Sequence, residues 1–245
     1  QENFNMQLRL PGIAVQLFAR VFSAGEINGN CRKIRLIKNS GATIKKRRPG
    51  VMLLQCIQYG CTEFHGIVNY KKQLIKAYFS ENEEHFNTVW YDEDKPLGTG
   101  GGLSLLKGKL SGTFFLTNCD LLIFTDYEKL LRFHRESGSA VTMVCAEKHV
   151  TIPYGVVETG ENGVITAMRE KPAFQFLTNT GLYLVEPEVL DDIGEDEVIG
   201  FPDIIERQRR RGRRVSAYTV GDEDWLDMGQ LDELEKMRER LYGKP

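Results

Sequence analysis

The sequence lacks the features that mark several large classes of protein. Its five cysteines are odd in number and form no C-x-x-C pair, so we expect free thiols and no zinc site. No run approaches the roughly 18 apolar residues that a membrane span needs. The N-terminus also lacks the charged-then-apolar layout of a secretory signal. We therefore expect a cytoplasmic protein with no membrane partner.

The sequence also has no strong excess of charge of one sign. Its net charge is −2, and none of its four histidines falls at metal-ligand spacing. A run of arginines at 207–214 follows a helical pattern, and cations favour the C-terminal end of a helix dipole. We interpret the run as a solvated helix end and expect no nucleic-acid partner.

Charge is nonetheless divided unevenly along the chain. Residues 1–50 carry ten Lys or Arg against two acids, hence +8, and the remainder carries 22 against 32, hence −10. Residues 1–54 also show no clear periodicity, apart from a candidate strand at 13–22. We therefore divide the chain into an atypical basic segment, 1–54, and an α/β domain, 55–245.

From residue 55 onward, short apolar runs alternate with amphipathic stretches. We expect strands at 63–69, 86–91, 113–117, 140–146, 155–159, 164–168, 182–185 and 215–220. We expect helices at 70–84, 103–107, 127–137, 202–211 and 230–241, with Asp126 as a cap residue and Gly212 after a helix end. The alternation predicts a mainly parallel sheet with helices on both faces.

A glycine-rich segment, Pro96 to Gly102, lies between an expected strand and an expected helix. Its four glycines let the backbone approach a ligand closely, and the start of the helix offers free N–H groups. The segment matches neither the P-loop nor the dinucleotide-binding fingerprint. Ligand binding and a simple turn are therefore both open readings of this segment.

Two aspartates each follow an apolar, strand-like run: Asp120 in F-L-T-N-C-D and Asp227 in W-L-D-M-G-Q. In open α/β sheets, ligands bind beyond the carboxyl ends of the strands. Mg²⁺ takes oxygen ligands and is usually held by one or two carboxylates and by the phosphates of a substrate. We therefore predict that both aspartates hold Mg²⁺, although a lone aspartate after a strand is commonly a turn or cap residue.

Six motifs together resemble the sugar-1-phosphate nucleotidyltransferases, also called nucleotide-sugar pyrophosphorylases. They are P-L-G-T-G-G-G-L, F-L-T-N-C-D, P-Y-G-V-V, E-K-P, N-T-G-L-Y and W-L-D-M-G-Q, in the family's order, over residues 55–241. The resemblance implies a Rossmann-like α/β fold of the nucleotide-diphospho-sugar transferase type. It also implies that a sugar 1-phosphate attacks the α-phosphorus of a nucleoside triphosphate, that pyrophosphate leaves, and that Mg²⁺ is the cofactor.

The resemblance also assigns roles to individual residues. The catalytic residues are Asp120 and Asp227, which would hold Mg²⁺, and Lys171, which would contact phosphate. The nucleotide would be bound by Leu97, Gly98, Thr99, Gly100 and Gly101. The sugar would be bound by Gly155, Glu170, Asn179, Thr180 and Gly181. The L-G-T-x-G-G form is most similar to members that handle mannose- or heptose-type sugars with guanine.

One part of the family's pattern is absent. The family opens with a G-G-x-G-T-R-L loop that wraps the triphosphate, followed by P-K-P-L, and neither motif occurs here. Either this chain has lost the loop, which would impair its activity, or residues 1–54 are not the native reading. A non-catalytic nucleotide-sugar-binding relative and a GT-A-type glycosyltransferase are the alternative functions. The oligomeric state is open, with a homo-oligomer among the options.

Overall fold

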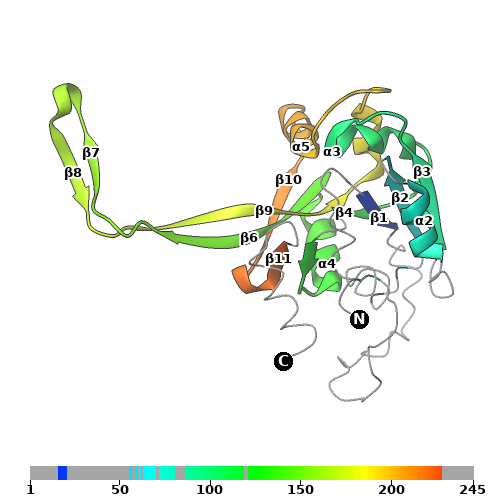
Figure 1. Cartoon of the computed structure of the whole chain (residues 1–245), viewed down its shortest axis with the longest axis horizontal. Helices are drawn as coiled ribbons and strands as arrows, with labels where there is room; N and C mark the ends of the chain where they lie inside the picture. The colour runs from blue at the N-terminus through cyan, green and yellow to red at the C-terminus, as the bar shows by residue number, and fades with distance from the viewer. Residues whose placement is uncertain are drawn as a thin grey trace, which may run out of the picture.

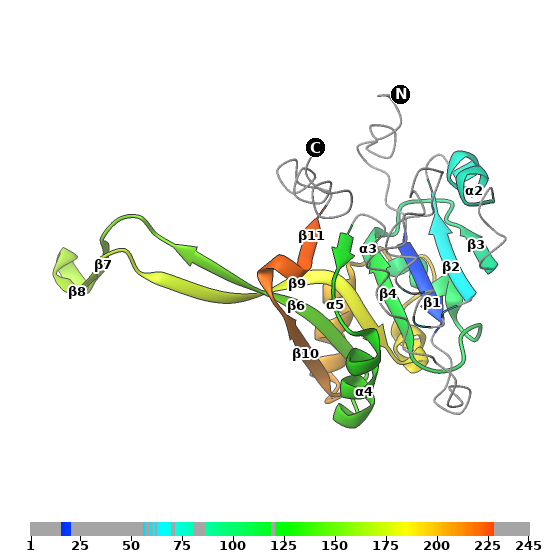
Figure 2. The same cartoon turned by 90° about the horizontal axis from the view of Figure 1, so that it is seen from below.

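The computed structural model describes residues 16–20 (backbone only), 56, 59, 61, 63–69, 72–80, 87–118 and 121–227. This part of the chain forms a body and a long arm that projects from it (Figures 1 and 2). The body is a seven-stranded sheet with helices on both faces, and the arm comprises residues 147–177. No helix in this part is both long and apolar enough to span a membrane.

The elements alternate along the chain in the body and give way to a long hairpin in the arm. The strands are β1 (Gln16–Arg20), β2 (Glu63–Val68), β3 (Asn87–Asp92), β4 (Phe114–Asn118), β5 (Leu121–Ile123), β6 (Val141–Thr151), β7 (Val156–Thr159), β8 (Ile165–Arg169), β9 (Ala173–Val185), β10 (Val215–Val220) and β11 (Trp225–Asp227). The helices are α2 (Lys72–Ser80), α3 (Gly98–Gly101), α4 (Tyr127–Ser137) and α5 (Phe201–Arg210), with 3-10 turns η2 (Gly102–Leu106), η3 (Glu161–Gly163), η4 (Pro187–Asp192) and η5 (Asp222–Asp224).

The seven strands lie in the order β10-β6-β9-β4-β1-β2-β3. Within this described sheet, only the pairs β10–β6 and β2–β3 are parallel, and the other four are antiparallel. The expectation of a mainly parallel sheet is therefore corrected to a mixed α/β sheet. The physical reason is that β1 and β9 alone run against the other five strands. Each of the two has two neighbours, so two reversals make four antiparallel pairs.

Two apolar clusters pack on the two faces of the sheet. One cluster joins α2 and α4 to the sheet through residues such as Phe79 and Leu130. The other joins η2, η4 and α5 to it through residues such as Leu106 and Ile204. Side chains alternate along a strand, so in β4 Phe115 belongs to the first cluster while its neighbour Phe114 belongs to the second. Helices therefore cover both faces, as the sequence predicts.

Local chemistry fixes the ends of α4 where the sequence places them. The Asp126 carboxylate accepts hydrogen bonds from the backbone N–H groups of Glu128 and Lys129, both at 3.1 Å. These bonds satisfy two N–H groups that have no partner inside the helix. Gly138 follows the helix in the left-handed region, with φ of +59°. Gly212 has φ of +76° shortly after α5, which confirms its expected place near a helix end.

The arm is a two-stranded extension of the sheet. Ala146 is the last residue of β6 that pairs with β10, and from Glu147 onward β6 pairs only with β9. Figures 1 and 2 both show the ribbon leaving the body, with the hairpin of β7 and β8 at its far end. Phe174 and Phe176 lie on one face of this ribbon, with ring centroids 6.3 Å apart. Phe176 is 52% exposed, so the ribbon buries little of its apolar surface.

The expected elements differ from the observed ones in a few places. The strand expected at 182–185 is the last part of β9, and β5 was not expected. The strand expected at 13–22 is β1, which lies between β2 and β4 (Figure 1). Apart from β1, residues 1–54 lie outside the described residues, as does the helix expected at 230–241. The boundary at residue 55 therefore stays a prediction.

Candidate active site

A cleft of about 340 Å³ opens at the carboxyl end of β4. Five residues that the sequence singles out line it: Thr99, Asn179, Thr180, Gly181 and Asp227. They belong to α3, β9 and β11, which are distant in the sequence. The fold thus brings parts of the glycine-rich, N-T-G-L-Y and W-L-D-M-G-Q motifs to one cavity.

An irregularity in β9 gives the N-T-G-L-Y motif its shape. Between Met143 and Cys145 of β6, the partner strand β9 advances four positions while β6 advances two. Gly181 lies at this bulge with φ of +89°, a conformation that glycine adopts readily. A Cβ on Gly181 would lie 2.8 Å from the Leu121 Cδ2 atom. Any side chain here would therefore strain the backbone and press on the cleft wall.

Hydrogen bonds hold the three residues of the bulge in place. The Thr180 hydroxyl, which is 4% exposed, donates to the Val144 carbonyl oxygen at 2.8 Å. The Asn179 amide donates to the Tyr183 hydroxyl at 2.6 Å and accepts from the Gly181 N–H at 3.0 Å. Burial raises the pKa of Tyr183, so its hydroxyl keeps its proton at neutral pH. That proton is available for a ligand in the cleft, because the bond from Asn179 uses the oxygen as acceptor.

The two predicted metal ligands come from motifs whose strands pair with each other. Asp227 ends β11 and lies opposite Leu121 of β5 in an antiparallel ladder. Leu121 directly follows Asp120 in the sequence, but Asp120 itself lies outside the described residues. Both Leu121 and Asp227 line the cleft. The pairing of the two carboxylates stays a prediction.

The oxygen donors of the cleft suit Mg²⁺ in their chemistry. Asp227 brings a carboxylate and Asn118 an amide oxygen to the same cavity. Mg²⁺ keeps several waters and needs few protein ligands when substrate phosphates supply others. Within the described ranges, no cluster of three or more His, Cys, Asp or Glu could enclose a metal ion. The donors of the described residues therefore fit an ion that a substrate shares.

The glycine-rich segment is a short helix that packs against α5. Gly98–Gly101 form α3, so helical structure begins at Gly98, before the helix expected at 103–107. A Cβ on Gly100 would lie 2.5 Å from the Ile204 Cδ1 atom, and one on Gly101 would overlap the Glu197 carbonyl oxygen. Both glycines are buried. Close helix packing therefore accounts for these two glycines.

Thr99 is the one member of the five expected nucleotide-binding residues that lines the cleft. Its hydroxyl accepts a hydrogen bond from the Phe201 N–H at 3.0 Å, which ties α3 to the first turn of α5. Leu97 is 4% exposed and belongs to the core. Gly98 is exposed and has φ of +77°. Their role in nucleotide binding stays a prediction.

The other three expected residues lie on the arm. Gly155, Glu170 and Lys171 are neighbours there: a Cβ on Gly155 would lie 3.1 Å from the Glu170 Oε2 atom. The Lys171 N–H donates to the Tyr154 carbonyl oxygen at 3.3 Å. Lys171 has φ of +44°, which is uncommon for a residue with a side chain. None of the three lines the cleft, and Figure 1 shows the arm pointing away from the body.

Several cleft residues were not singled out in the sequence. They are Leu116, Asn118, Leu121, Tyr183, Phe201, Pro202 and Trp225. Alternation along β9 could have found Tyr183, which lies two positions after Gly181. Trp225 opens the W-L-D-M-G-Q motif, and the Lys148 ammonium lies 5.1 Å from its ring centroid. No signal in the sequence brings Phe201 and Pro202 here, because a long loop separates them from β9.

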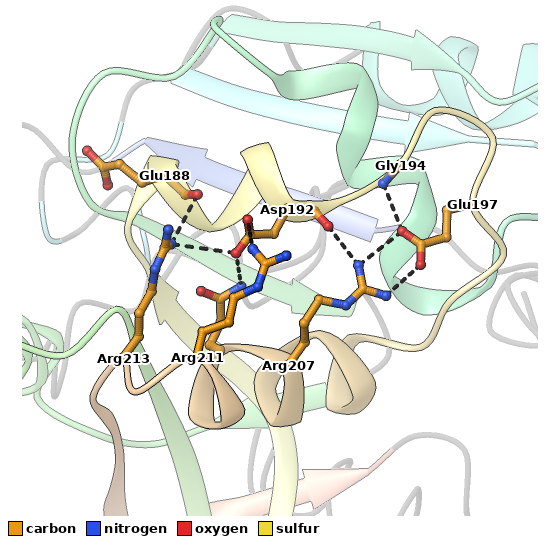
Figure 3. Close-up of polar contacts among 8 residues, drawn as sticks. Glu188, Asp192, Gly194, Glu197, Arg207, Arg211 and Arg213 are labelled. Atoms are coloured by element: carbon orange, nitrogen blue, oxygen red, sulfur yellow. Dashed lines mark hydrogen bonds and ion pairs between the residues drawn. The ribbon is translucent and has the colours of Figure 1, made fainter.

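An ion-pair network fixes α5, whose first turn lines the cleft. Arg207 donates to both carboxylate oxygens of Glu197, at 2.5 and 3.2 Å, and to the Asp192 carbonyl oxygen at 2.7 Å (Figure 3). Arg211 and Arg213 both pair with the Asp192 carboxylate. The bond from Arg207 holds the pKa of Glu197 at about 2. These arginines therefore anchor the helix to the loop before it.

Comparison with known proteins gives a consistent result. A family model described as "Nucleotidyl transferase" matches residues 49–242. Mannose-1-phosphate guanylyltransferase catalytic subunit beta of Drosophila melanogaster is 29% identical over 188 residues, 71% of this chain and 48% of that protein. UTP–glucose-1-phosphate uridylyltransferase of Synechocystis sp. is 29% identical over 199 residues, 71% of this chain and 50% of that protein. The chain spans about half the length of these curated relatives.

Two solved structures share the fold. The crystal structure of HddC from Yersinia pseudotuberculosis has a TM-score of 0.59 at 18% identity and covers 78% of this chain and 84% of its own. The structure of HddC complexed with GMP-PN has a TM-score of 0.56 at 18% identity and covers 84% of this chain and 94% of its own. At this identity the likeness concerns the fold alone.

Proposed function

The chain belongs to the nucleotidyl transferase family, and from this premise we propose that it transfers a nucleotidyl group from a nucleoside triphosphate to a sugar 1-phosphate. The observation that carries the proposal is the cleft, which gathers Thr99, Asn179, Gly181 and Asp227 at the carboxyl end of β4. The two curated relatives compared above are named as enzymes that act on sugar 1-phosphates.

The reaction needs positioning more than it needs a protein nucleophile. A phosphate oxygen of the sugar 1-phosphate forms a bond to the α-phosphorus, and the bond from that phosphorus to the bridging oxygen of pyrophosphate breaks. Both anionic substrates must therefore be held in line, and the charge that grows on the leaving group must be stabilised. Asp120 and Asp227 would hold Mg²⁺, which neutralises phosphate charge when it is bound.

The sugar would lie against the bulge of β9. Asn179 and Thr180 have their polar atoms engaged with protein partners, so they hold the wall of the cleft in shape. The Tyr183 hydroxyl accepts from the Asn179 amide, so its own proton is free to be donated. We assign it the role of donor to a sugar hydroxyl. Gly181 lets β9 lie close to Leu121 in the cleft wall, where a Cβ would not fit.

The arm would supply the remaining contacts. In this proposal Glu170 accepts from a sugar hydroxyl and Lys171 donates to phosphate. Since both lie on the arm, they can reach a substrate in the cleft only if the arm bends toward the body. The two-stranded ribbon has few neighbours to hold it in one position, which supports such a motion.

For the finer specificity, we propose a mannose- or heptose-type sugar and a guanine nucleotide. Support comes from the L-G-T-x-G-G form at Leu97–Gly102 and from the printed names of relatives that include mannose-1-phosphate guanylyltransferases. The partners would be small molecules. The arginines at 207–213 pair with carboxylates, which lowers the positive charge that this surface offers to a nucleic-acid backbone.

The absent G-G-x-G-T-R-L motif favours a second candidate, a relative that binds nucleotide-sugar without turnover. Loss of one preorganised donor commonly costs about 10²–10³ in rate, and here a whole loop is absent from the sequence. The test combines pyrophosphate release from the common nucleoside triphosphates, in the presence of mannose, glucose, glucosamine or heptose 1-phosphate, with binding of the corresponding nucleotide-sugars. We expect saturable binding and slow turnover. Turnover of about 10 s⁻¹, ordinary for an enzyme, would show that the loop is dispensable, and absence of both binding and turnover would refute the proposal.

A further inference from the structure

A second cavity, of about 640 Å³, lies at the opposite end of the sheet from the cleft. It is bordered by the end of α4, by Glu186 after β9 and by Arg214 before β10. The same strand, β9, carries Asn179 and Gly181 to the cleft and Glu186 to this cavity. The volume is in the range of sites for small metabolites. Nothing in the proposed reaction uses it.

This cavity is distinguished by arginines that form no ion pair with a described carboxylate. Seven of the nine arginines with described side chains have a carboxylate within 4 Å: Arg132, Arg169, Arg207, Arg209, Arg210, Arg211 and Arg213. Within the described part of the chain, Arg135 and Arg214 have none. Both line the same cavity. Two guanidinium groups with no described carboxylate within 4 Å therefore share one concave surface, and the third arginine of the lining is Arg213.

The glutamates of the lining do not neutralise these charges by direct contact. The Glu186 Oε1 atom accepts from the Thr113 hydroxyl at 2.6 Å and lies 2.9 Å from the His134 Nε2 atom. The bond with His134, and more weakly the charge of Arg135, lower the pKa of Glu186, so the carboxylate is ionised and its Oε1 atom faces Thr113 and His134. Figure 3 shows the Glu188 carboxylate pointing away from Arg213, which bonds to the Glu188 carbonyl oxygen instead.

Hydrogen bonds hold the side chains behind the arginines. His134 is 1% exposed, and its Nδ1 atom lies 2.7 Å from the Thr142 hydroxyl, so both ring nitrogens have partners. Arg214 donates to the Ser137 carbonyl oxygen at 2.9 Å, which places its guanidinium over the end of α4. One hydrogen bond to a carbonyl leaves the other N–H groups of that guanidinium for a ligand.

We propose that this cavity binds a small phosphate-bearing anion between Arg135 and Arg214, at a site separate from the cleft. A guanidinium offers parallel N–H donors that match two oxygens of a phosphate, and its charge does not depend on pH. The cavity is large enough for a phosphate monoester of a sugar as well as for the free ion. The chemistry shared by both is the dianionic phosphate group.

The experiment is titration calorimetry of the full chain with inorganic phosphate and, in a second arm, with glucose 6-phosphate. Ionic strength is held constant, because salt screens such contacts. The test variant is R135Q/R214Q. We expect it to bind phosphate at least about tenfold more weakly for each arginine removed, since charged hydrogen bonds of this kind are worth that factor or more. Tighter binding of the monoester would identify the metabolite as the source, and equal binding would identify the free ion.

Matched variants separate this site from a general effect of charge. R132Q/R169Q removes the same two positive charges from positions outside the cavity lining, so it should bind as the unaltered chain does. R135K/R214K keeps both positive charges but lacks the planar guanidinium groups, so it should bind phosphate with intermediate affinity. This variant still tests the proposal if R135Q/R214Q does not fold. Phosphate binding that is unchanged in R135Q/R214Q, or absent from the unaltered chain, would overturn the proposal.

Discussion

The body and the arm differ most in how far they bury apolar side chains. Phe64 and Leu103 in the body are 0% exposed, whereas Tyr154 is 73% and Met168 71% exposed on the arm. The body is therefore held together by burial, while the arm depends on ladder hydrogen bonds and few side-chain contacts. A two-stranded ribbon of this kind is marginally stable on its own in water.

The difference coincides with a division of the candidate site. The cleft residues Asn179, Gly181 and Asp227 belong to the body, and Glu170 and Lys171 belong to the arm. A rigid half fixes the geometry of the cavity, and a weakly held half can approach it after substrate has entered. If Glu170 and Lys171 bind substrate as proposed, the site is complete only in a conformation where arm and body meet.

The largest expected effect concerns stability. Phe64→Ala removes a fully buried aromatic side chain and should lower the free energy of unfolding by about 3–5 kcal/mol. Phe176→Ala removes the same side chain from the arm, where it is half-exposed, and should change that free energy by about 0.5 kcal/mol or less. Urea unfolding measures both. Equal losses would mean that the arm is as well packed as the body.

The next effect concerns the body half of the site. Asp227→Asn keeps the shape of the side chain and removes the charge that would hold Mg²⁺, so Mg²⁺-dependent binding of GDP-mannose should weaken by about 100-fold or more. The melting temperature should not fall. Asp196→Asn, an exposed residue paired with Lys95, is the control and should bind normally. Equal affinities in the two variants would remove Asp227 from the site.

A smaller effect tests the arm half of the site. Lys171→Gly removes the ammonium group and also relieves the positive φ of +44°. Affinity for mannose 1-phosphate should fall about tenfold, as expected for one charged hydrogen bond, while stability stays equal or rises. Arg169→Gln is the matched control, because its partner is Glu158 on the same hairpin. If Arg169→Gln lowers the affinity for mannose 1-phosphate to the same extent, the cause is the overall positive charge of the arm and not Lys171 itself.

The smallest effect concerns the network behind the cleft. The pKa of Glu197 is about 2 in the folded protein and 4.5 as its ordinary value, chiefly because Arg207 donates to it. Its contribution to stability is therefore present above pH 4.5 and is lost as the pH falls from 4.5 toward 2. Glu197→Gln and Arg207→Gln should each flatten this part of the stability profile. The double variant should resemble either single one, and additive effects would show that the pair is not coupled.

Local chemistry made part of this structure predictable. Asp126 and Gly138 mark the ends of α4, and the bounds expected for that helix agree with Tyr127–Ser137. The motif N-T-G-L-Y pointed to Asn179 and Gly181, which the structure places in the cleft. These features depend on residues close together in the sequence, and such patterns are what a single sequence records.

Other parts depend on partners that a local pattern does not record. The direction of β9 relative to β4 follows from the return of the chain along the arm, so the mixed sheet was not foreseen. The full length of β9 was missed because its first half has no core to face. The glycines of α3 were placed before the start of a helix, but they pack against Glu197 and Ile204, about a hundred positions later. That Arg135 and Arg214 have no carboxylate within 4 Å among the described residues likewise appears only in three dimensions.

Hydrogen exchange measured by mass spectrometry tests the central claim, that the arm joins the cleft when substrate is present. Few other elements pack against the arm in the free protein, so its backbone amides at 154–171 should exchange quickly. Addition of GDP-mannose with Mg²⁺ should slow exchange both in peptides of the cleft that contain residues 179–183 and in those of the arm. Slower exchange in the cleft with no change at 154–171 would show that the body binds substrate without the arm, and would contradict the account.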